Sequence, residues 1–357
     1  MDNNEVMLNN IISEQEKQLL IKAIEESENV VVVAHTAPDG DAVGSSLALS
    51  GVLKKMGKNV GVVMPDALPK SIMFLQGATD IKIYKENQDE CRRVIENADT
   101  IFCLDFNESK RVDLMQNDLL EAKAYKVMID HHMYPSDFCN LVISYPLISS
   151  TSLLVYKVLS QLGYNHMIEK AEAEAIYTGM MTDTGNFSYN SNDSDIYIAI
   201  SQLLQRGIDK DEIYKIVCNT STINKLKLNS YAISEKMEIL DGGVAIITLS
   251  RAELNRYLYQ KGDTEGLVNQ PLGIEGVNIS IFYREENGYV KVSLRSVGEY
   301  PVNIIASDLY NGGGHKNASG GEIHNSLKAA EAIFYMGMEE WSKSEEECIK
   351  QLFKKSE

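Results

Sequence analysis

The chain has 357 residues, of which 44% are hydrophobic, and its 34 basic and 51 acidic residues give a formal net charge of −17. This length predicts two domains, and the hydrophobic content excludes a disordered protein. The negative charge argues against binding of long duplex nucleic acid, which needs basic residues to neutralise phosphates, but it allows a short anionic substrate in a local basic pocket.

The first half of the chain predicts alternating helices and strands. A helix is expected over 13–27, where Ser13 and Glu16 fit a capping box and one face carries Leu19, Leu20, Ala23 and Ile24. Apolar runs predict buried strands at 30–34, 59–64, 100–104 and 125–129, and further helices are expected at 43–56, 151–162 and 169–181. This alternation is typical of an α/β fold with helices on both faces of a mostly parallel sheet of about five strands.

The second half changes character. Residues 195–235 predict helices that link the domains, and β-rich segments follow at 243–249, 278–283 and 289–296. A helix at 302–311 with a glycine stop and a terminal helix at 326–341 complete a smaller α+β domain, and the acidic tail after it is expected to be a solvated helix end. We therefore predict a catalytic domain over 1–195, a helical linker over 196–235 and a second domain over 236–357.

Targeting signals and cysteine patterns indicate the compartment. The N-terminus is acidic and polar, and no apolar run approaches the roughly 20 residues of a membrane span. No CxxC pair occurs among the five cysteines, which are Cys91, Cys103, Cys139, Cys218 and Cys348. Free thiols in a reducing cytosol, and thus a cytoplasmic protein with no membrane partner, are expected.

Acidic and imidazole side chains lie beside apolar runs in four places. Taken singly, they have ordinary explanations as a solvated turn, a helix cap or a core histidine. In an open α/β sheet, however, the carboxyl ends of the strands meet at one crevice where ligands bind. Their joint occurrence therefore favours one site, made from His35, Asp39, Asp41, Asp105, Asp130, His131, His132 and Asp183.

The kinds of side chain in this set indicate a metal. Two imidazoles and four carboxylates without a thiolate disfavour structural zinc and suit Mn²⁺, with Mg²⁺ or Co²⁺ as alternatives. Six ligands are too many for one ion that keeps an open position. They suit two ions about 3.5–4 Å apart that share a bridging carboxylate.

A phosphate substrate at such a centre would need basic partners. Four aspartates balance two divalent ions, so the negative charge of a phosphodiester must be met by other side chains, of which Arg111 is one. The second domain offers Arg295 and the segment NGGGHKNASGG at 311–321. Its glycines allow close backbone approach and an anion-binding nest of N–H groups, although a glycine-rich turn is the ordinary alternative. No GxxxxGK[ST] phosphate loop is present.

The segments HTAPDGDAVGS, LDFNES, IDHH, MTDTGNF and GGGHKNASGG resemble those of the DHH phosphoesterases that carry a DHH-associated C-terminal domain. The resemblance covers about residues 15–340. Length and domain order are most similar to the stand-alone bacterial nanoRNases that also act on 3′-phosphoadenosine 5′-phosphate (pAp).

The resemblance implies a role for each residue. His35, Asp39 and Asp105 would bind one Mn²⁺, and the second would be bound by Asp41, Asp105, His131 and Asp183. Asp130 would support the ligand His131, and His132 would act beside the scissile phosphate as a hydrogen-bond donor or general acid. The phosphate and base of the substrate would be held by Arg295, Gly313, Gly314, His315, Asn317 and Ser319.

The implied activity is hydrolysis of short single-stranded RNA to 5′-mononucleotides, of pAp to AMP, or both. Phosphodiesterases of cyclic or linear di-adenylate, exopolyphosphatases and a nucleotide sensor without catalysis remain alternatives. Type II inorganic pyrophosphatases share the first-domain motifs, but their second domain carries a compact run of Ser, Arg and Lys that is absent here. A homodimer is expected because symmetric dimers are the commonest oligomers.

Overall fold

A computed structural model of the chain describes residues 8–341. The chain divides into two compact units, Met1–Thr220 and Ser221–Glu357. This division lies inside the segment 196–235 that the sequence predicts as a linker. The acidic tail after residue 341, predicted as a solvated helix end, and Cys348 lie outside the described residues.

The first unit contains a six-stranded sheet in which every neighbouring pair is parallel. Its order is β3-β2-β1-β4-β5-β6. The strands are β1 (Asn29–Val33), β2 (Asn59–Met64), β3 (Lys82–Ile83), β4 (Thr100–Leu104), β5 (Tyr125–Asp130) and β6 (Leu141–Ser144). The sequence predicted four of them at nearly these bounds, and it missed β3 and β6 because both are short.

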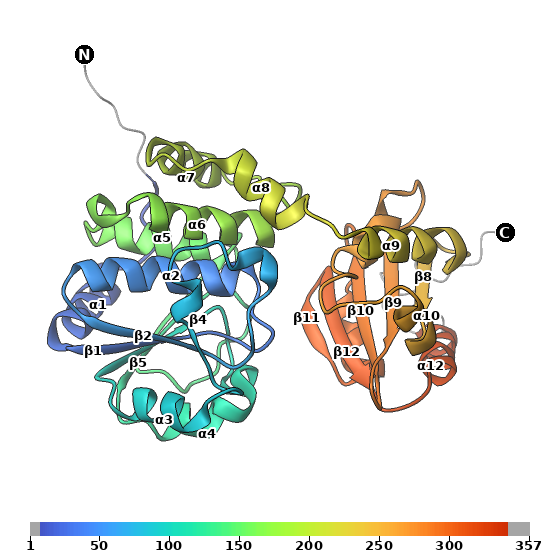
Figure 1. Cartoon of the computed structure of the whole chain (residues 1–357), viewed down its shortest axis with the longest axis horizontal. Coiled ribbons are helices and arrows are strands. Elements are labelled where there is room, and N and C mark those ends of the chain that lie inside the picture. The colour runs from blue at the N-terminus through green and yellow to red at the C-terminus, as the bar shows by residue number, and fades with distance from the viewer. Residues whose placement is uncertain (1–7, 342–357) are drawn as a thin grey trace, which may run out of the picture. The chain divides into compact units, whose positions relative to one another are not determined.

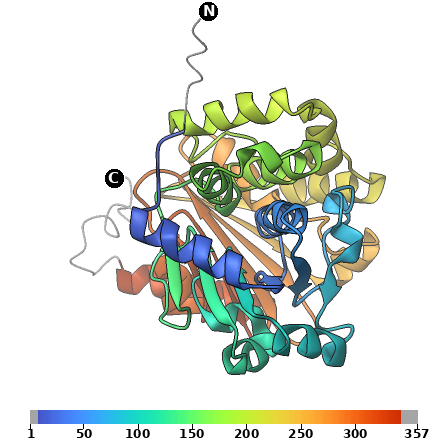
Figure 2. The same ribbon diagram turned by 90° about the vertical axis from the view of Figure 1, so that its left-hand side faces the viewer.

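Helices cover both faces of this sheet, as predicted (Figure 1 and Figure 2). Val30 and Val32 point into one core, and Val31 and Val33 point into the other, which is the period of two expected for a strand buried on both faces. The second core is closed by α3 (Gln88–Glu96) and α4 (Gln116–Glu121). The first is closed by α1 (Glu14–Glu26), α2 (Gly40–Lys55), α5 (Thr151–Gln161), α6 (Lys170–Asp183), α7 (Ser194–Gln205) and α8 (Lys210–Cys218).

Two helices differ in detail from those that the sequence predicts. Helix α1 begins with the predicted capping box of Ser13 and Glu16, although Leu19 on its expected buried face is 37% exposed. Helix α2 begins at Gly40, three residues before the predicted start. The reason is that the Asp39 carboxylate accepts hydrogen bonds from the N–H groups of Asp41 and Ala42 and so caps the helix earlier.

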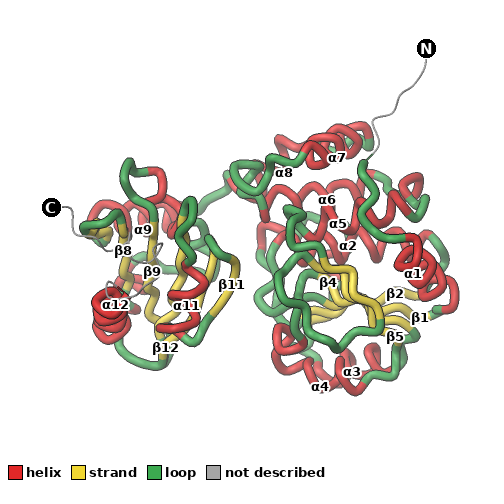
Figure 3. Tube along the Cα trace, turned by 180° about the vertical axis from the view of Figure 1, so that it is seen from behind, coloured by secondary structure: helices red, strands yellow, loops and turns green. Residues whose placement is uncertain are grey.

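The second unit is a smaller α+β domain, in which strands and helices both occur (Figure 3). Its mixed sheet has the order β11-β12-β10-β9-β8-β7, where only β8 and β9 pair in parallel among the described strands. One face packs against α11 (Val302–Tyr310) and α12 (Leu327–Trp341), and the other packs against α9 (Ile223–Glu235) and α10 (Arg251–Arg256). The strands are β7 (Met237–Leu240), β8 (Val244–Leu249), β9 (Ile279–Glu285), β10 (Val290–Ser296), β11 (Gly313–His315) and β12 (Ala318–Ile323).

The glycine-rich segment 311–321, predicted to be an anion-binding nest or a turn, forms a β-hairpin of β11 and β12. Gly313 pairs with Gly320, and a Cβ atom on Gly312 would lie 2.0 Å from the carbonyl oxygen of Gly320. A Cβ atom on Gly321 would lie 2.5 Å from the carbonyl oxygen of Tyr310. Close backbone packing therefore explains these glycines. The preceding helix α11 ends at Asn311 in the left-handed conformation (φ 48°), and not at a glycine.

None of the helices within residues 8–341 is long and apolar enough to span a membrane. The buried cysteines in this range, Cys91, Cys103 and Cys139, are in no disulfide, as predicted.

Candidate metal centre

The predicted metal ligands of the first unit gather at the carboxyl ends of three adjacent strands. His35 lies two residues after β1, Asp105 follows β4 directly, and Asp130 ends β5 with His131 next to it. The strand order reverses between β1 and β4, which is where open α/β sheets bind ligands. Asp183 comes from another direction, because it is the last residue of α6.

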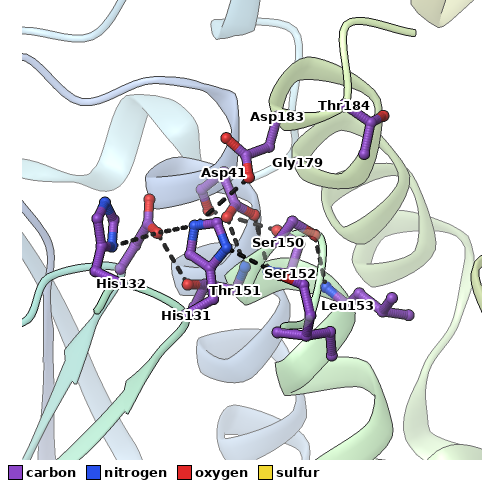
Figure 4. Close-up of polar contacts among 12 residues, drawn as sticks. Asp41, His131, His132, Ser150, Thr151, Ser152, Leu153, Gly179, Asp183 and Thr184 are labelled. Carbon is purple, nitrogen blue, oxygen red and sulfur yellow. Dashed lines mark hydrogen bonds and ion pairs between the residues drawn. The ribbon is translucent and has the colours of Figure 1, made fainter. Parts of the chain in front are cut away.

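Two imidazoles are anchored by backbone carbonyls and turned toward carboxylates (Figure 4 shows the His131 side). Nδ1 of His35 lies 2.7 Å from the carbonyl oxygen of Thr36, and Nδ1 of His131 lies 3.2 Å from that of Ile148. If each Nδ1 carries the proton and donates it, Nε2 presents a lone pair, as in metal-bound histidines. Nε2 of His131 lies 3.5 Å from Asp183 Oδ2.

The Asp105 carboxylate lies between the two histidines. Its Oδ2 is 3.3 Å from Nε2 of His35, and its Oδ1 is 3.6 Å from Nε2 of His131. The side chain is almost fully buried, and the backbone adopts the left-handed φ of +63°. Backbone strain of this kind is found where the surrounding structure fixes a functional side chain.

The six predicted ligands fall into two compact groups, and Asp105 also forms a group with Asp130 and His132. Within each group the donor atoms lie within 4.8 Å of one another. The two ligand groups are His35, Asp39 and Asp105, and Asp41, His131 and Asp183. The first group is one of the ligand sets that the resemblance implied, and the second group is the other set without Asp105, whose Oδ1 lies 3.6 Å from Nε2 of His131. The fold therefore brings the six predicted ligands close together, and metal binding by them stays a prediction.

The N-terminus of α5 adds contacts that sequence reasoning missed. Asp41 is fully buried, and its two carboxylate oxygens accept hydrogen bonds from the N–H groups of Thr151 (2.6 Å) and Ser152 (2.8 Å) (Figure 4). The Thr151 hydroxyl donates to Asp105 Oδ1 at 2.9 Å. The signal in the sequence was the run of four hydroxyl residues at 149–152, directly before and at the start of a predicted helix.

Asp130 supports His132, whereas the resemblance implied support of His131. The buried Asp130 carboxylate lies 2.7 Å from Nδ1 of His132 and accepts the His132 backbone N–H at 3.0 Å. The His131 ring is instead held by the Ile148 carbonyl. Asp130 is therefore in position to fix the ring orientation and Nδ1 protonation of His132.

The electrostatics of this cluster favour bound positive charge. Burial opposes protonation of both imidazoles, but nearby carboxylates raise the pKa of His35 and of His131 to about 9. Burial and the Asp105 and Asp39 charges raise the pKa of Asp183 to about 7. Without metal the cluster thus retains protons, which a cation would displace. Imidazole nitrogens and carboxylate oxygens together fit a divalent metal ion.

Arg111 lies close to His35 of this centre, and its binding of phosphate stays a prediction. It belongs to the short 3₁₀ segment η3 (Ser109–Met115), and its carbonyl oxygen accepts the N–H of Thr36 at 2.8 Å. Its exposed guanidinium contributes a charge that lowers the pKa of His35.

In the second unit, the predicted substrate residues share neighbouring strands. Arg295 on β10 pairs with Ala318 on β12, and its Nη1 donates to the carbonyl oxygen of Ser319 at 3.3 Å. Gly313, Gly314 and His315 form β11, and the Ser319 hydroxyl donates to the His315 carbonyl. Asn317 donates from Nδ2 to Ser296 Oγ and to the Gly298 carbonyl, so it holds the hairpin turn. Contact of these residues with a substrate stays a prediction.

Curated relatives with similar sequences include oligoribonucleases. The "Bifunctional oligoribonuclease and PAP phosphatase NrnA" of Bacillus subtilis is 26% identical over 87% of this chain and 94% of its own length. The protein of the same name from Thermus thermophilus is 28% identical over 85% and 86%. The "Cyclic-di-AMP phosphodiesterase GdpP" of B. subtilis is 29% identical over 84% of this chain but only 46% of its own length.

Among solved structures, an exopolyphosphatase-related protein from Bacteroides fragilis is 44% identical, with a TM-score of 0.91 over 94% of this chain and 99% of that one. RecJ from T. thermophilus, solved in complex with Mn²⁺, shares the fold at 14% identity and a TM-score of 0.53 over 93% and 56%. Sequence models described as "DHH family, N-terminal domain" and "DHHA1 domain" match residues 29–180 and 242–337. The chain therefore belongs to the DHH family of phosphoesterases.

Proposed function

We propose that this phosphoesterase hydrolyses short single-stranded oligoribonucleotides to 5′-mononucleotides, and pAp to AMP, with two Mn²⁺ ions as cofactor. The observation that carries the proposal is that the two oxygens of Asp105 face His35 of one ligand group and His131 of the other. Support for the substrate class comes from the relatives named as oligoribonuclease and PAP phosphatase, which match this chain over most of their own length. Mg²⁺ or Co²⁺ would suit the same donors.

The six side chains would divide between two ions. His35, Asp39 and Asp105 would hold one ion, and the other would be held by Asp41, Asp105, His131 and Asp183. When bound, two such ions supply a water molecule of lowered pKa and neutralise charge on the phosphate. Because Asp105 is shared, its carboxylate would fix the spacing of the two halves.

His132 is proposed to donate a proton or hydrogen bond to the phosphate or the leaving oxygen. With Asp130 accepting from Nδ1, the ring is held in one orientation and Nε2 is left to face the substrate. Burial of the Asp130 carboxylate makes this interaction stronger than it would be in water.

Positive charge for the substrate is proposed to come from two arginines. Arg111 lies near His35, and Arg295 stands beside the hairpin of the second unit. Both would offset the phosphate charge that the aspartates repel. The net charge of −17 supports a short substrate, because a long duplex would meet repulsion over most of the surface.

Two other substrate classes have specific support. The relative named as a cyclic-di-AMP phosphodiesterase points to cyclic or linear di-adenylate. The solved structure at 44% identity is titled exopolyphosphatase-related, which points to polyphosphate. These alternatives share the metal centre and differ in the substrate, so substrate assays separate them.

The test is a panel of substrates assayed with Mn²⁺, with products identified by mass spectrometry. It contains di- to pentaribonucleotides, pAp, linear and cyclic di-adenylate, and polyphosphate. The proposal expects 5′-mononucleotides and AMP as the main products and no turnover in chelator. Phosphate release from polyphosphate alone, or full activity in chelator, would overturn it. The expected homodimer is checked on the same protein by sedimentation velocity.

A further inference from the structure

The N-terminus of α5 makes hydrogen bonds that its own capping does not require. Ser150 is the N-cap residue, and its side chain accepts the N–H of Leu153 at 3.1 Å. The two N–H groups between them, those of Thr151 and Ser152, have no partner inside a helix. Both donate to the buried Asp41 carboxylate, so the positive end of this helix is directed at one predicted metal ligand.

The Thr151 hydroxyl is directed at a different carboxylate. It donates to Asp105 Oδ1 at 2.9 Å, and the side chain is completely buried. Thr151 therefore contacts Asp41 through its backbone and Asp105 through its side chain. These two aspartates come from α2 and from the end of β4, and each belongs to a different one of the two ligand groups.

Tight packing fixes the helix end that carries Thr151. A Cβ atom on Gly179 of α6 would lie 1.9 Å from Ser152 Oγ and 2.8 Å from Asp41 Oδ1. A Cβ atom on Gly44 of α2 would lie 2.3 Å from the carbonyl oxygen of Ala175. The two glycines let α2, α5 and α6 approach closely, so the donors of Thr151 are held in place by the backbones around them.

We propose that Thr151 is a positioning residue that couples the two halves of the metal centre. Its hydroxyl fixes the Asp105 carboxylate, which otherwise sits on a strained backbone, while its N–H fixes Asp41. The hydroxyl bonds to Oδ1, the oxygen nearer His131, so its loss acts mainly on the ion held by Asp41, His131 and Asp183. The inference rests on the two-ion centre of the proposed function but does not depend on which phosphoester is cleaved.

The experiment compares Thr151→Val, which removes the hydroxyl, with Thr151→Ser, which keeps it. The matched control is Thr178→Val on α6, because Thr178 is equally buried but donates to the backbone carbonyl of Glu174. Mn²⁺ is titrated into chelator-treated protein by calorimetry, and electron paramagnetic resonance reports whether two bound ions are magnetically coupled.

Thr151→Val is expected to bind the ion at Asp41, His131 and Asp183 about 10- to 100-fold less tightly than the wild-type protein does. The signal from magnetically coupled ions should also be lost. The Mn²⁺ affinities of Thr151→Ser and Thr178→Val should stay within about twofold of the wild-type value. In steady-state assays with the substrate found in the panel, kcat should fall while KM changes little.

Equal Mn²⁺ affinity and an equal coupled signal in Thr151→Val would overturn the inference. Circular dichroism and thermal melts confirm that each variant is folded, and Thr151→Ala replaces Thr151→Val if valine overfills the site. Failure of the proposed function would give a different result from failure of this inference. The wild-type protein would then bind two coupled Mn²⁺ ions but hydrolyse no nucleotide.

Discussion

The Oδ2 atom of Asp105 lies 3.3 Å from Nε2 of His35, although the two side chains follow different strands of the sheet. The other oxygen of the same carboxylate faces His131. One buried carboxylate thus contacts an imidazole from each half of the centre, and this geometry is what two ions sharing a ligand require.

Asp105→Asn should abolish most activity while preserving the fold. Asparagine tolerates the left-handed backbone at this position, but it cannot supply a bridging carboxylate. We expect kcat/KM to fall by at least about 10²-fold and Mn²⁺ stoichiometry by calorimetry to drop below two. Asp137→Asn, at an exposed aspartate of the same unit, is the control and should change neither value. Unchanged stoichiometry in Asp105→Asn would contradict the bridging role.

The metal-free protein should lose thermal stability as pH rises from about 6.5 to 9. The pKa of His35 and of His131 is raised from 6.5 to about 9 in the folded state. The stability that their protonated forms give the fold is therefore fully present below pH 6.5 and is lost as the pH rises through 9. Asp183 acts in the same direction, because its pKa is raised from 3.8 to about 7 in the folded state. The cost of ionising this buried carboxyl lowers the stability between pH 3.8 and 7, and the loss is complete above pH 7.

The measurement is the melting temperature against pH in chelator and in Mn²⁺. With Mn²⁺ present the fall should be smaller, because the metal replaces the protons. A double variant, His35→Asn with His131→Asn, should flatten the chelator curve. A melting temperature that rises from pH 6.5 to 9 in chelator would contradict the coupling of these histidines to the carboxylates.

Gly179→Ala should weaken metal binding although it adds only a methyl group. The new Cβ atom would overlap Ser152 and the Asp41 carboxylate, so α6, which also carries Asp183, must shift. We expect about 1–3 kcal/mol of lost stability and weaker Mn²⁺ binding by calorimetry. Gly273→Ala, where nothing lies within 4 Å, should cost less than about 0.5 kcal/mol. If both variants bind Mn²⁺ equally well, the close helix packing is not needed for the centre.

Arg295→Ala should act on substrate binding more than on chemistry. Its guanidinium is proposed to pair with the substrate phosphate, so we expect KM to rise on the order of tenfold with a smaller change in kcat. Arg256→Ala in the same unit is the control, because that guanidinium stacks 5.5 Å from the ring centre of Tyr257. An unchanged KM of Arg295→Ala for every nucleotide tested would show that the second unit holds substrate by other residues.

The position of the metal centre could be predicted because each ligand group follows an element with a clear pattern. Buried strands end at residues 33, 104 and 130, and parallel strands bring their carboxyl ends to one edge. Asp183 was found in the same way, at the end of an apolar helix. Local patterns and one topological rule were sufficient to select the six residues that the fold brings together, and their binding of metal stays a prediction.

Other features depend on contacts that local patterns do not encode. Thr151 looks like an ordinary start of a helix, and its bond to Asp105 exists only once α5 packs against α2 and β5. The strands β3 and β6 are too short for a period of two to be visible. The glycines at 312–314 suggested an anion-binding nest, whereas in the hairpin Gly312 and Gly314 are needed because a Cβ atom on either would overlap backbone oxygens of β12.

The most direct test of the central claim is the anomalous scattering of Mn²⁺ in crystals of the protein. We expect two peaks about 3.5–4 Å apart. One should lie by His35 and Asp39, the other by Asp41, His131 and Asp183, with the Asp105 carboxylate between them. A single peak, or two peaks that Asp105 does not bridge, would contradict the shared-carboxylate centre.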